Sequence, residues 1–232
     1  MKKHKDAGSI PGDPFPDMTL LLLLLAAFLL GSIPFGLIVG KLLLGIDVRE
    51  SGSGNIGMTN VMRVGGKFPG VLTFLLDFGK GSLAVWLAQR WLTGETNAPI
   101  WQVSLIAVTT VCGHVFSVFL RFKGGKGVST LFGVLATLNL SVGLGAAAVW
   151  LGFFIAKRIS SLSALTMLAT LPVWFLLIPW FQGNSVIWSQ FGMFCALDVL
   201  LLYKHRDNIA RLRTGQEAEL KAPNSTPSEL ST

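Results

Sequence analysis

Residues 127–156 read GVSTLFGVLATLNLSVGLGAAAVWLGFFIA, a run of 30 residues without a charged side chain. An apolar helix needs only about 20 residues to cross a bilayer. The run is therefore either one tilted span or two short ones. A break is favoured at Asn139 and Ser141, with Gly143 and Gly145 just after it. How this stretch divides sets the number of spans, and with it the loops that share one side of the membrane.

The rest of the chain also has the composition of an integral membrane protein. Of its 232 residues, 51% are hydrophobic and 13% are charged, and the mean hydropathy is +0.61. A soluble domain carries about 25% charged residues. These values exclude an ordinary cytosolic enzyme, a nucleic-acid-binding domain and a disordered protein. Cys112 and Cys195 lie in apolar runs, which is typical of neither a disulfide framework nor a metal site.

Other uncharged or nearly uncharged runs predict further membrane spans. The run at 159–197 is too long for one span, and Pro179 with the polar residues 182–184 divides it. Besides the spans within 127–156, we expect membrane helices at 18–40, 68–92, 100–121, 163–181 and 186–203.

The distribution of Lys and Arg decides how the run at 127–156 is interpreted. Two short spans there bring the total to about seven, and 14 of the 19 Lys and Arg residues then lie in loops on one face. Cytoplasmic loops carry excess Lys and Arg. The sequence thus predicts an all-α membrane protein with its N-terminus outside and its C-terminus in the cytoplasm. We expect a disordered extension at 1–17, one transmembrane domain at 18–215 and a polar cytoplasmic tail at 216–232.

A polar segment at 51–63, SGSGNIGMTNVMR, lies on the predicted cytoplasmic face. Its GxGxxG pattern is not a dinucleotide site, because no strand precedes it and no βαβ unit surrounds it. Closely spaced glycines do let backbone amides surround an anion, and Arg63 is a bidentate cation suited to phosphate. The alternative is a flexible connecting loop. The predicted phosphate contacts are Gly52, Ser53, Gly54, Asn55, Gly57, Thr59, Asn60 and Arg63.

A second segment, KGGKGVST at 123–130, has the parts of a phosphate loop. It is not a Walker A sequence, because the first glycine of that motif is missing. Consecutive glycines, two lysines and a following helix N-terminus still favour phosphate binding. The alternative is a basic membrane anchor. The predicted contacts are Lys123, Gly124, Gly125, Lys126 and Gly127.

A third cationic segment and three intramembrane residues complete the candidate site. His205 and Asn208 lie three residues apart, so they share one face if the last membrane helix continues; the alternative is a basic helix end followed by a solvated tail. Asp77 and Lys80 are expected to pair or to face a polar cavity, because an unpaired intramembrane charge costs about 2.5–3.5 kcal/mol or more. His114 either faces the site or makes a structural hydrogen bond. From the residues alone, the chain is a membrane enzyme or a transporter for a phosphorylated compound.

The ordered set of these motifs closely resembles the bacterial membrane-integral acyl-phosphate:glycerol-3-phosphate acyltransferase family, over roughly residues 19–217. The resemblance is carried by the segments 31–36, 53–63, 76–81, 113–114, 122–128 and 205–217. By motif, it implies that Ser53, Arg63, His205 and Asn208 are catalytic or bind substrate. It also implies that Gly124, Gly125, Lys126 and Gly127 form the glycerol 3-phosphate loop, and that Glu217 is structural.

The resemblance further implies the reaction and its setting. An acyl group passes from acyl phosphate to the 1-hydroxyl of sn-glycerol 3-phosphate, giving 1-acylglycerol 3-phosphate (lysophosphatidate) and phosphate. No cofactor or metal is implied. The expected partners are the two substrates, the bilayer and, transiently, the enzyme that forms acyl phosphate. The expected location is the bacterial inner membrane, with the active site facing the cytoplasm. The alternatives are a transporter of an organic phosphate, an acyltransferase with a thioester donor, and a scaffolding protein.

Overall fold

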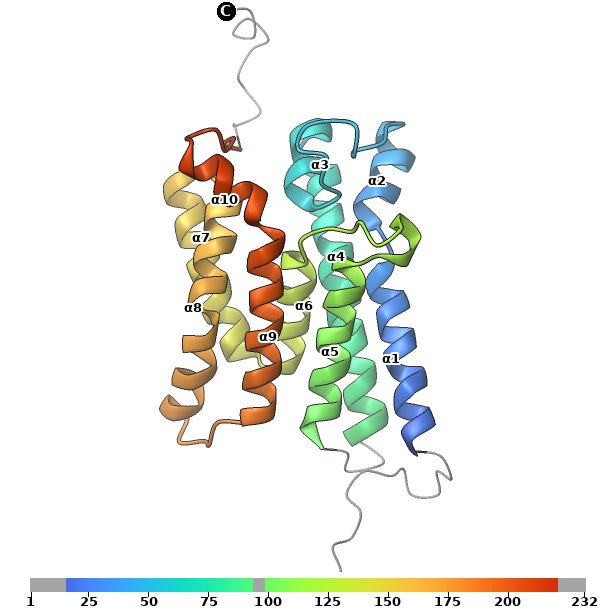
Figure 1. Cartoon of the computed structure of the whole chain (residues 1–232), viewed down its shortest axis with the longest axis vertical. Coiled ribbons are helices and arrows are strands. Elements are labelled where there is room, and N and C mark those ends of the chain that lie inside the picture. Colours follow the sequence, from blue (N-terminus) through green and yellow to red (C-terminus); the bar gives the residue numbers. More distant parts are fainter. Residues whose placement is uncertain (1–15, 94–98, 221–232) are drawn as a thin grey trace, which may run out of the picture.

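The computed structural model describes residues 16–93 and 99–220, and every regular element in these residues is helical (Figure 1). The chain forms long helices side by side, with short helices at one end of the bundle. The elements are α1 (Pro16–Ser32), α2 (Phe35–Leu44), α3 (Met58–Gly65), α4 (Lys67–Ala88), a π-helical turn (Gln89–Thr93), α5 (Ile100–Val115), a 3₁₀ turn (Val118–Leu120), α6 (Val128–Leu138), α7 (Leu140–Lys157), α8 (Ser160–Phe181), α9 (Trp188–Lys204) and α10 (Arg206–Arg213).

The first predicted span is not one continuous helix. It is interrupted between α1 and α2 at Ile33 and Pro34. Proline has no amide hydrogen and crowds the preceding turn, so the Leu37 amide donates to Pro34 O rather than to Ile33 O. The predicted span at 18–40 is confirmed as one candidate span, Met18–Leu44, whose helix is interrupted at Pro34. The break places the Ile33 carbonyl inside the bundle, within reach of Lys80.

The run at 127–156 is divided where the sequence predicted. α6 ends at Leu138, and the Asn139 side chain caps α7 by accepting a hydrogen bond from Val142 N (3.2 Å). An Asn at this position satisfies an amide that the new helix leaves unpaired. α6 is consequently only 11 residues long.

Five segments of the described chain are long and apolar enough to cross a membrane. The 11-residue α6 and the 17-residue α9 are shorter than these. The seven-span count and the orientation of the termini therefore stay predictions. Of the predicted tails at 1–17 and 216–232, residues 1–15 and 221–232 lie outside the described residues. The five segments are Met18–Leu44, Lys67–Leu92, Ile100–Leu120, Leu140–Lys157 and Ser160–Phe181.

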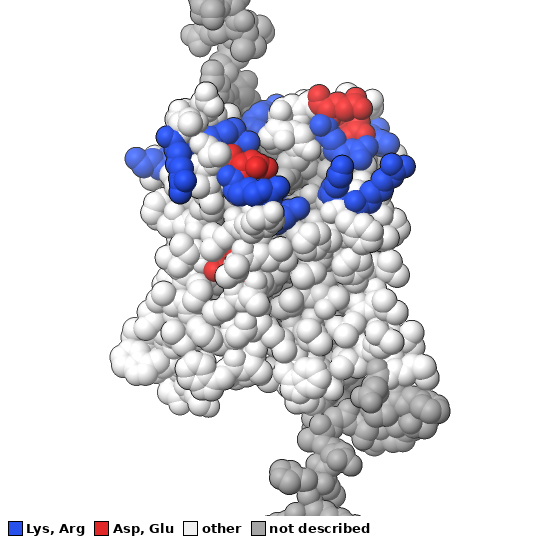
Figure 2. Space-filling view, viewed as in Figure 1, with Lys and Arg blue, Asp and Glu red and all other residues white. Residues whose placement is uncertain are grey.

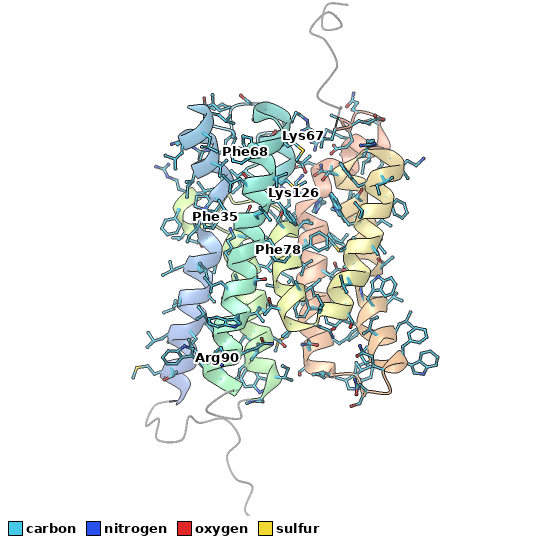
Figure 3. All side chains as sticks on the ribbon, turned by 180° about the vertical axis from the view of Figure 1, so that it is seen from behind. Phe35, Lys67, Phe68, Phe78, Arg90 and Lys126 are labelled. Atoms are coloured by element: carbon cyan, nitrogen blue, oxygen red, sulfur yellow. The ribbon has the colours of Figure 1, made fainter. Side chains whose placement is uncertain are left out.

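Positive charge gathers at one end of the bundle. On the face shown in Figure 2, Lys and Arg side chains cluster at the upper end, where Figure 1 places α3 and α10. Arg90 lies at the opposite end (Figure 3). Such an asymmetry is what the positive-inside rule expects of a cytoplasmic face.

Glycine lets α4 and α6 pack in backbone contact. Gly81 lies against the Thr130 carbonyl, and Gly133 lies against the Phe78 carbonyl; a Cβ at either position would overlap these atoms. Small residues are the usual means of close helix approach in membranes. The contact holds the start of α6, and the loop before it, beside Phe78 and its neighbours on α4.

Candidate active site

One cavity of about 610 Å³ joins most of the residues singled out in the sequence. Its polar end lies between α3, the loop before α6, the start of α8 and α10. Its apolar end runs between α4, α6 and α7. In Figure 3, Lys126 lies nearer the cationic end of the molecule, and Phe78 lies deeper in the bundle. Of the predicted site residues, the cavity is lined by Ser53, Asn55, Gly57, Thr59, Asn60, Arg63, Asp77, His114, Lys126, Gly127, His205, Asn208 and Glu217.

The loop before α3 is folded around the buried amide of Asn60. Asn60 Oδ1 accepts a hydrogen bond from Ser53 N (2.7 Å), and Asn60 Nδ2 donates to Val48 O and Ser51 O. Gly52 and Gly54 both have a positive φ, a conformation that glycine adopts without strain. Asn60 and these glycines thus shape the loop that presents Ser53.

Two side chains of this segment remain open to a ligand. Ser53 Oγ makes no hydrogen bond within residues 16–93 and 99–220, and Arg63 pairs with no carboxylate there. Asn55 instead closes a local turn by accepting from Gly57 N (2.8 Å), and Thr59 shares a 2.9 Å hydrogen bond with Ser160. Ser53 and Arg63 are therefore the members of this segment best placed to meet substrate.

The glycine loop at 123–127 is docked on the end of α5. Gly124 N donates to Val115 O (3.2 Å), and Gly125 N donates to His114 O (3.1 Å). These two amides are occupied, so their predicted contact with phosphate requires the loop to open. Gly127 has a φ of +81° and begins α6. Lys123 faces a separate cleft with Arg49 and Arg121, and only Lys126 of the two lysines enters the main cavity.

Lys126 reaches across the cavity to α10. Its Nζ donates a hydrogen bond to Asn208 Oδ1. Burial lowers the pKa of Lys126 to about 8, even though Glu217 nearby favours the charged form. The ammonium is thus largely charged at neutral pH.

Glu217 ties three segments together at the rim. Its Oε1 accepts from Asn208 Nδ2 (2.6 Å) and Ser161 Oγ (2.7 Å), and its Oε2 accepts from Arg211 Nε (2.6 Å). Burial alone raises the pKa of Glu217, but these hydrogen bonds bring it below the usual value. Residues 216–220, predicted to begin a polar tail, instead return to the start of α8, where Leu220 N donates to Arg158 O.

His205 is a neutral imidazole at the end of α9. It is 2% exposed, and burial lowers its pKa to about 4. Its Nδ1 lies 2.8 Å from Leu201 O. A carbonyl only accepts hydrogen bonds, so Nδ1 carries the hydrogen and Nε2 keeps a free lone pair.

The intramembrane residues lie at the floor of the cavity. Asp77 and Lys80 form the expected ion pair (2.8 Å), and His114 lies 3.5 Å from the same Asp77 oxygen. Asp77 and His114 line the cavity, whereas Lys80 lies behind them.

The start of α8 and an apolar groove also line the cavity, and neither was predicted from the sequence. Ser160 and Ser161 line the cavity, and Ser161 holds Glu217. Two serines after the basic pair Lys157–Arg158 were the available signal. The groove is lined by Phe78, Phe132, Ala136, Leu140, Gly143, Leu144, Ala147, Trp150 and Leu151.

Comparison with known proteins agrees with this geometry. The family model described as glycerol-3-phosphate acyltransferase matches residues 21–215. The chain is 40% identical to a glycerol-3-phosphate acyltransferase of Ralstonia pickettii, covering 88% of this chain and 96% of the relative. It is 44% identical to the one of Dinoroseobacter shibae, covering 88% and 94%.

Two solved structures share the fold. Both are crystal structures of PlsY, an integral membrane glycerol 3-phosphate acyltransferase. The glycerol 3-phosphate form has a TM-score of 0.76 at 40% identity, covering 88% of this chain and 96% of that one. The lysophosphatidic acid form has a TM-score of 0.75 at 39% identity, covering 87% and 95%. The family match at 21–215 includes every cavity-lining residue except Glu217 and Ala218, and this chain therefore belongs to the glycerol-3-phosphate acyltransferase family of integral membrane enzymes.

Proposed function

We propose that this protein transfers a fatty acyl group from acyl phosphate to the 1-hydroxyl of sn-glycerol 3-phosphate, releasing lysophosphatidate and phosphate. The observation that carries the proposal is the single cavity whose cationic end continues into an apolar groove. A substrate with a phosphate head and an acyl tail matches both ends at once. Glycerol 3-phosphate, the acceptor, has no acyl chain and needs only the cationic end.

The cationic end suits two phosphate groups. A phosphate monoester carries about −1.5 to −2 charges, so two of them repel each other strongly. Arg63 and Lys126 line the cavity from different segments, and the α6 N-terminus beside Gly127 adds unpaired amides. These groups offset the repulsion and hold both substrates together, which is the main requirement for an already activated donor.

The groove between α4, α6 and α7 is the proposed acyl site. Phe78, Phe132 and Trp150 line it with apolar surface, and the small residue Ala147 leaves room between them. A chain in this groove points toward the bilayer interior, while its phosphate remains at the cationic end. The donor therefore enters sideways from the membrane, and glycerol 3-phosphate enters from the cytoplasm.

The reaction needs no metal or cofactor in this proposal. The 1-hydroxyl oxygen attacks the acyl carbonyl carbon, and the bond between that carbon and the phosphate oxygen breaks. The hydroxyl proton passes to a phosphate oxygen of the substrate, and phosphate leaves. Lys126 and Arg63 stabilise the negative charge that develops. His205 Nε2 is the rival acceptor of this proton, although a pKa of about 4 makes it a weak base.

We further propose that the protein is a multi-pass protein of the bacterial inner membrane. The clustered Lys and Arg side chains (Figure 2) support a cytoplasmic position for the end that carries the site. A transient link to the enzyme that forms acyl phosphate belongs to the same proposal, because it would shorten the path of a reactive donor.

The decisive experiment uses the purified full chain in lipid. Labelled glycerol 3-phosphate is supplied with palmitoyl phosphate or with palmitoyl-CoA, and lysophosphatidate and released phosphate are measured. Product from acyl phosphate alone, lost in Arg63→Gln and kept in the exposed Arg213→Gln, is the expected result. If product forms only from palmitoyl-CoA, acyl phosphate is not the donor. Label accumulating inside sealed vesicles without product makes the protein a transporter.

A further inference from the structure

Three ionisable side chains meet at the floor of the cavity, within the apolar part of the molecule. Asp77, Lys80 and His114 are each at most 3% exposed. Lys80 Nζ lies 2.8 Å and His114 Nδ1 lies 3.5 Å from Asp77 Oδ1. Both contacts are to one oxygen of Asp77, so its carboxylate joins the Lys80 ammonium to the His114 ring. Apolar residues often replace such buried pairs without loss of stability. Stability alone is thus a weak reason for their presence.

On one side, Lys80 of this group is hydrogen-bonded to the break between α1 and α2. Lys80 Nζ donates a 2.8 Å hydrogen bond to Ile33 O. An unbroken helix would use this carbonyl for the Leu37 amide, which bonds to Pro34 O instead. Lys80 therefore joins the α1–α2 break to Asp77 on α4.

On the other side, it supports the glycine loop. The His114 ring lies directly beneath Gly125, where a Cβ would overlap Nε2. The Gly125 amide bonds to the carbonyl of the same histidine (3.1 Å). Lys126 follows at once and enters the cavity to meet Asn208. Where His114 lies thus sets where the loop places the Lys126 ammonium.

We propose that Lys80, Asp77 and His114 form a positioning triad that places Lys126 for binding of the acceptor phosphate. The inference rests on the proposed function and names residues that act through Lys126. Lys80 anchors Asp77 to the α1–α2 break, Asp77 orients the His114 ring, and the ring supports Gly125. A shift at any step moves the ammonium away from the phosphate.

The test separates positioning from charge balance. Asp77→Asn and Lys80→Met each leave one buried charge unpaired, so both single variants are expected to be poorly folded. The double variant is neutral and is expected to recover yield and Tm. Its KM for glycerol 3-phosphate should still rise about tenfold to a hundredfold, because small misplacements of a binding group are that costly. Its KM for acyl phosphate should change little. Thr73→Val, which removes a buried hydrogen bond within α4, is the matched control.

A second variant tests the same proposal without changing a charged side chain. Gly125→Ala places a methyl group against the His114 ring and should raise the KM for glycerol 3-phosphate in the same way. Gly79→Ala is its control, because no atom lies near a Cβ there. The proposed triad is overturned if the double variant folds and if both it and Gly125→Ala keep the wild-type KM for glycerol 3-phosphate. A wild-type protein that makes no lysophosphatidate overturns the proposed function instead.

Discussion

Lys126 and Asn208 meet through a hydrogen bond that spans 82 residues of sequence. The lysine comes from the glycine loop before α6, and the asparagine comes from α10. Asn208 also donates to Glu217, so a single amide joins the main cation of the cavity to the carboxylate at its rim. The glycine loop and the Glu217 carboxylate are therefore coupled, and variants at either end should affect acceptor binding.

Replacing Asn208 with Ala should lower kcat/KM for glycerol 3-phosphate by about tenfold to a hundredfold. The change removes the acceptor of Lys126 and one donor to Glu217, and unsatisfied buried groups cost about 1–3 kcal/mol. Steady-state kinetics with varied glycerol 3-phosphate measures the effect. The exposed Asn184→Ala is the control, and an unchanged kcat/KM in Asn208→Ala contradicts the coupling.

The pH dependence should report the charge of Lys126. Because its pKa is about 8, the Lys126 side chain carries a positive charge below pH 8 and loses its proton as the pH rises through that value. The kcat/KM for glycerol 3-phosphate, which reflects the free enzyme, should therefore fall above pH 8. In Lys126→Arg the guanidinium stays charged, so the fall should move to higher pH. Identical alkaline limbs in the two proteins would exclude Lys126 as the titrating group.

His205→Gln tests whether a protein base is needed. If the substrate phosphate takes the proton, the variant should bind glycerol 3-phosphate normally and lose less than about a hundredfold in kcat, because a general base contributes about 10²–10⁴-fold. Binding is measured by calorimetry and turnover by phosphate release. Abolished turnover with intact binding would identify His205 as the base.

Ala147→Leu should shorten the preferred acyl chain. Ala147 lines the groove, and a larger side chain there fills space that the acyl tail occupies. Competition between palmitoyl phosphate and a shorter acyl phosphate gives the ratio of kcat/KM values. Ala148→Leu is the matched control, because Ala148 is exposed on the outer side of α7. Equal ratios in both variants would place the tail elsewhere.

Site-specific labelling tests the predicted topology. In a chain with Cys112 and Cys195 replaced by Ala, Lys157→Cys should react with an impermeant thiol reagent only from the cytoplasmic side. Ser185→Cys, in the exposed α8–α9 connection, should react only from the opposite side. Labelling of both positions from one side would contradict the seven-span arrangement.

The sequence predicted the helical class and several helix ends because their causes are local. Asn139 caps the helix that follows it, and Gly183, with a φ of +68°, begins the turn after α8. The break at Pro34 was equally local but was hidden in a long apolar run. Hydropathy alone does not report a helix interruption at which Ile33 O accepts hydrogen bonds from the Phe35 amide and from Lys80 of another helix.

The types of residue that line the cavity were predictable from the sequence, but their hydrogen-bond partners were not. The sequence marks Gly124 and Gly125 as unusual, yet only the fold shows that their amides donate to α5. Lys123 and Lys126 look alike in the sequence, and the docked loop directs only Lys126 into the cavity. Ser161 carries no motif, and its contact with Glu217 crosses 56 residues.

The hydrogen bond between Ser161 and Glu217 also sets the order in which the site is completed during synthesis. Glu217 follows the other polar groups of the cavity along the chain, and a domain folds from its N-terminal part as it is translated. A ribosome-bound chain that has released α1 to α9 still lacks both Asn208, on α10, and the Glu217 carboxylate that bonds to it. The cavity therefore has its full set of polar groups only after α10 and the segment beyond it have left the ribosome.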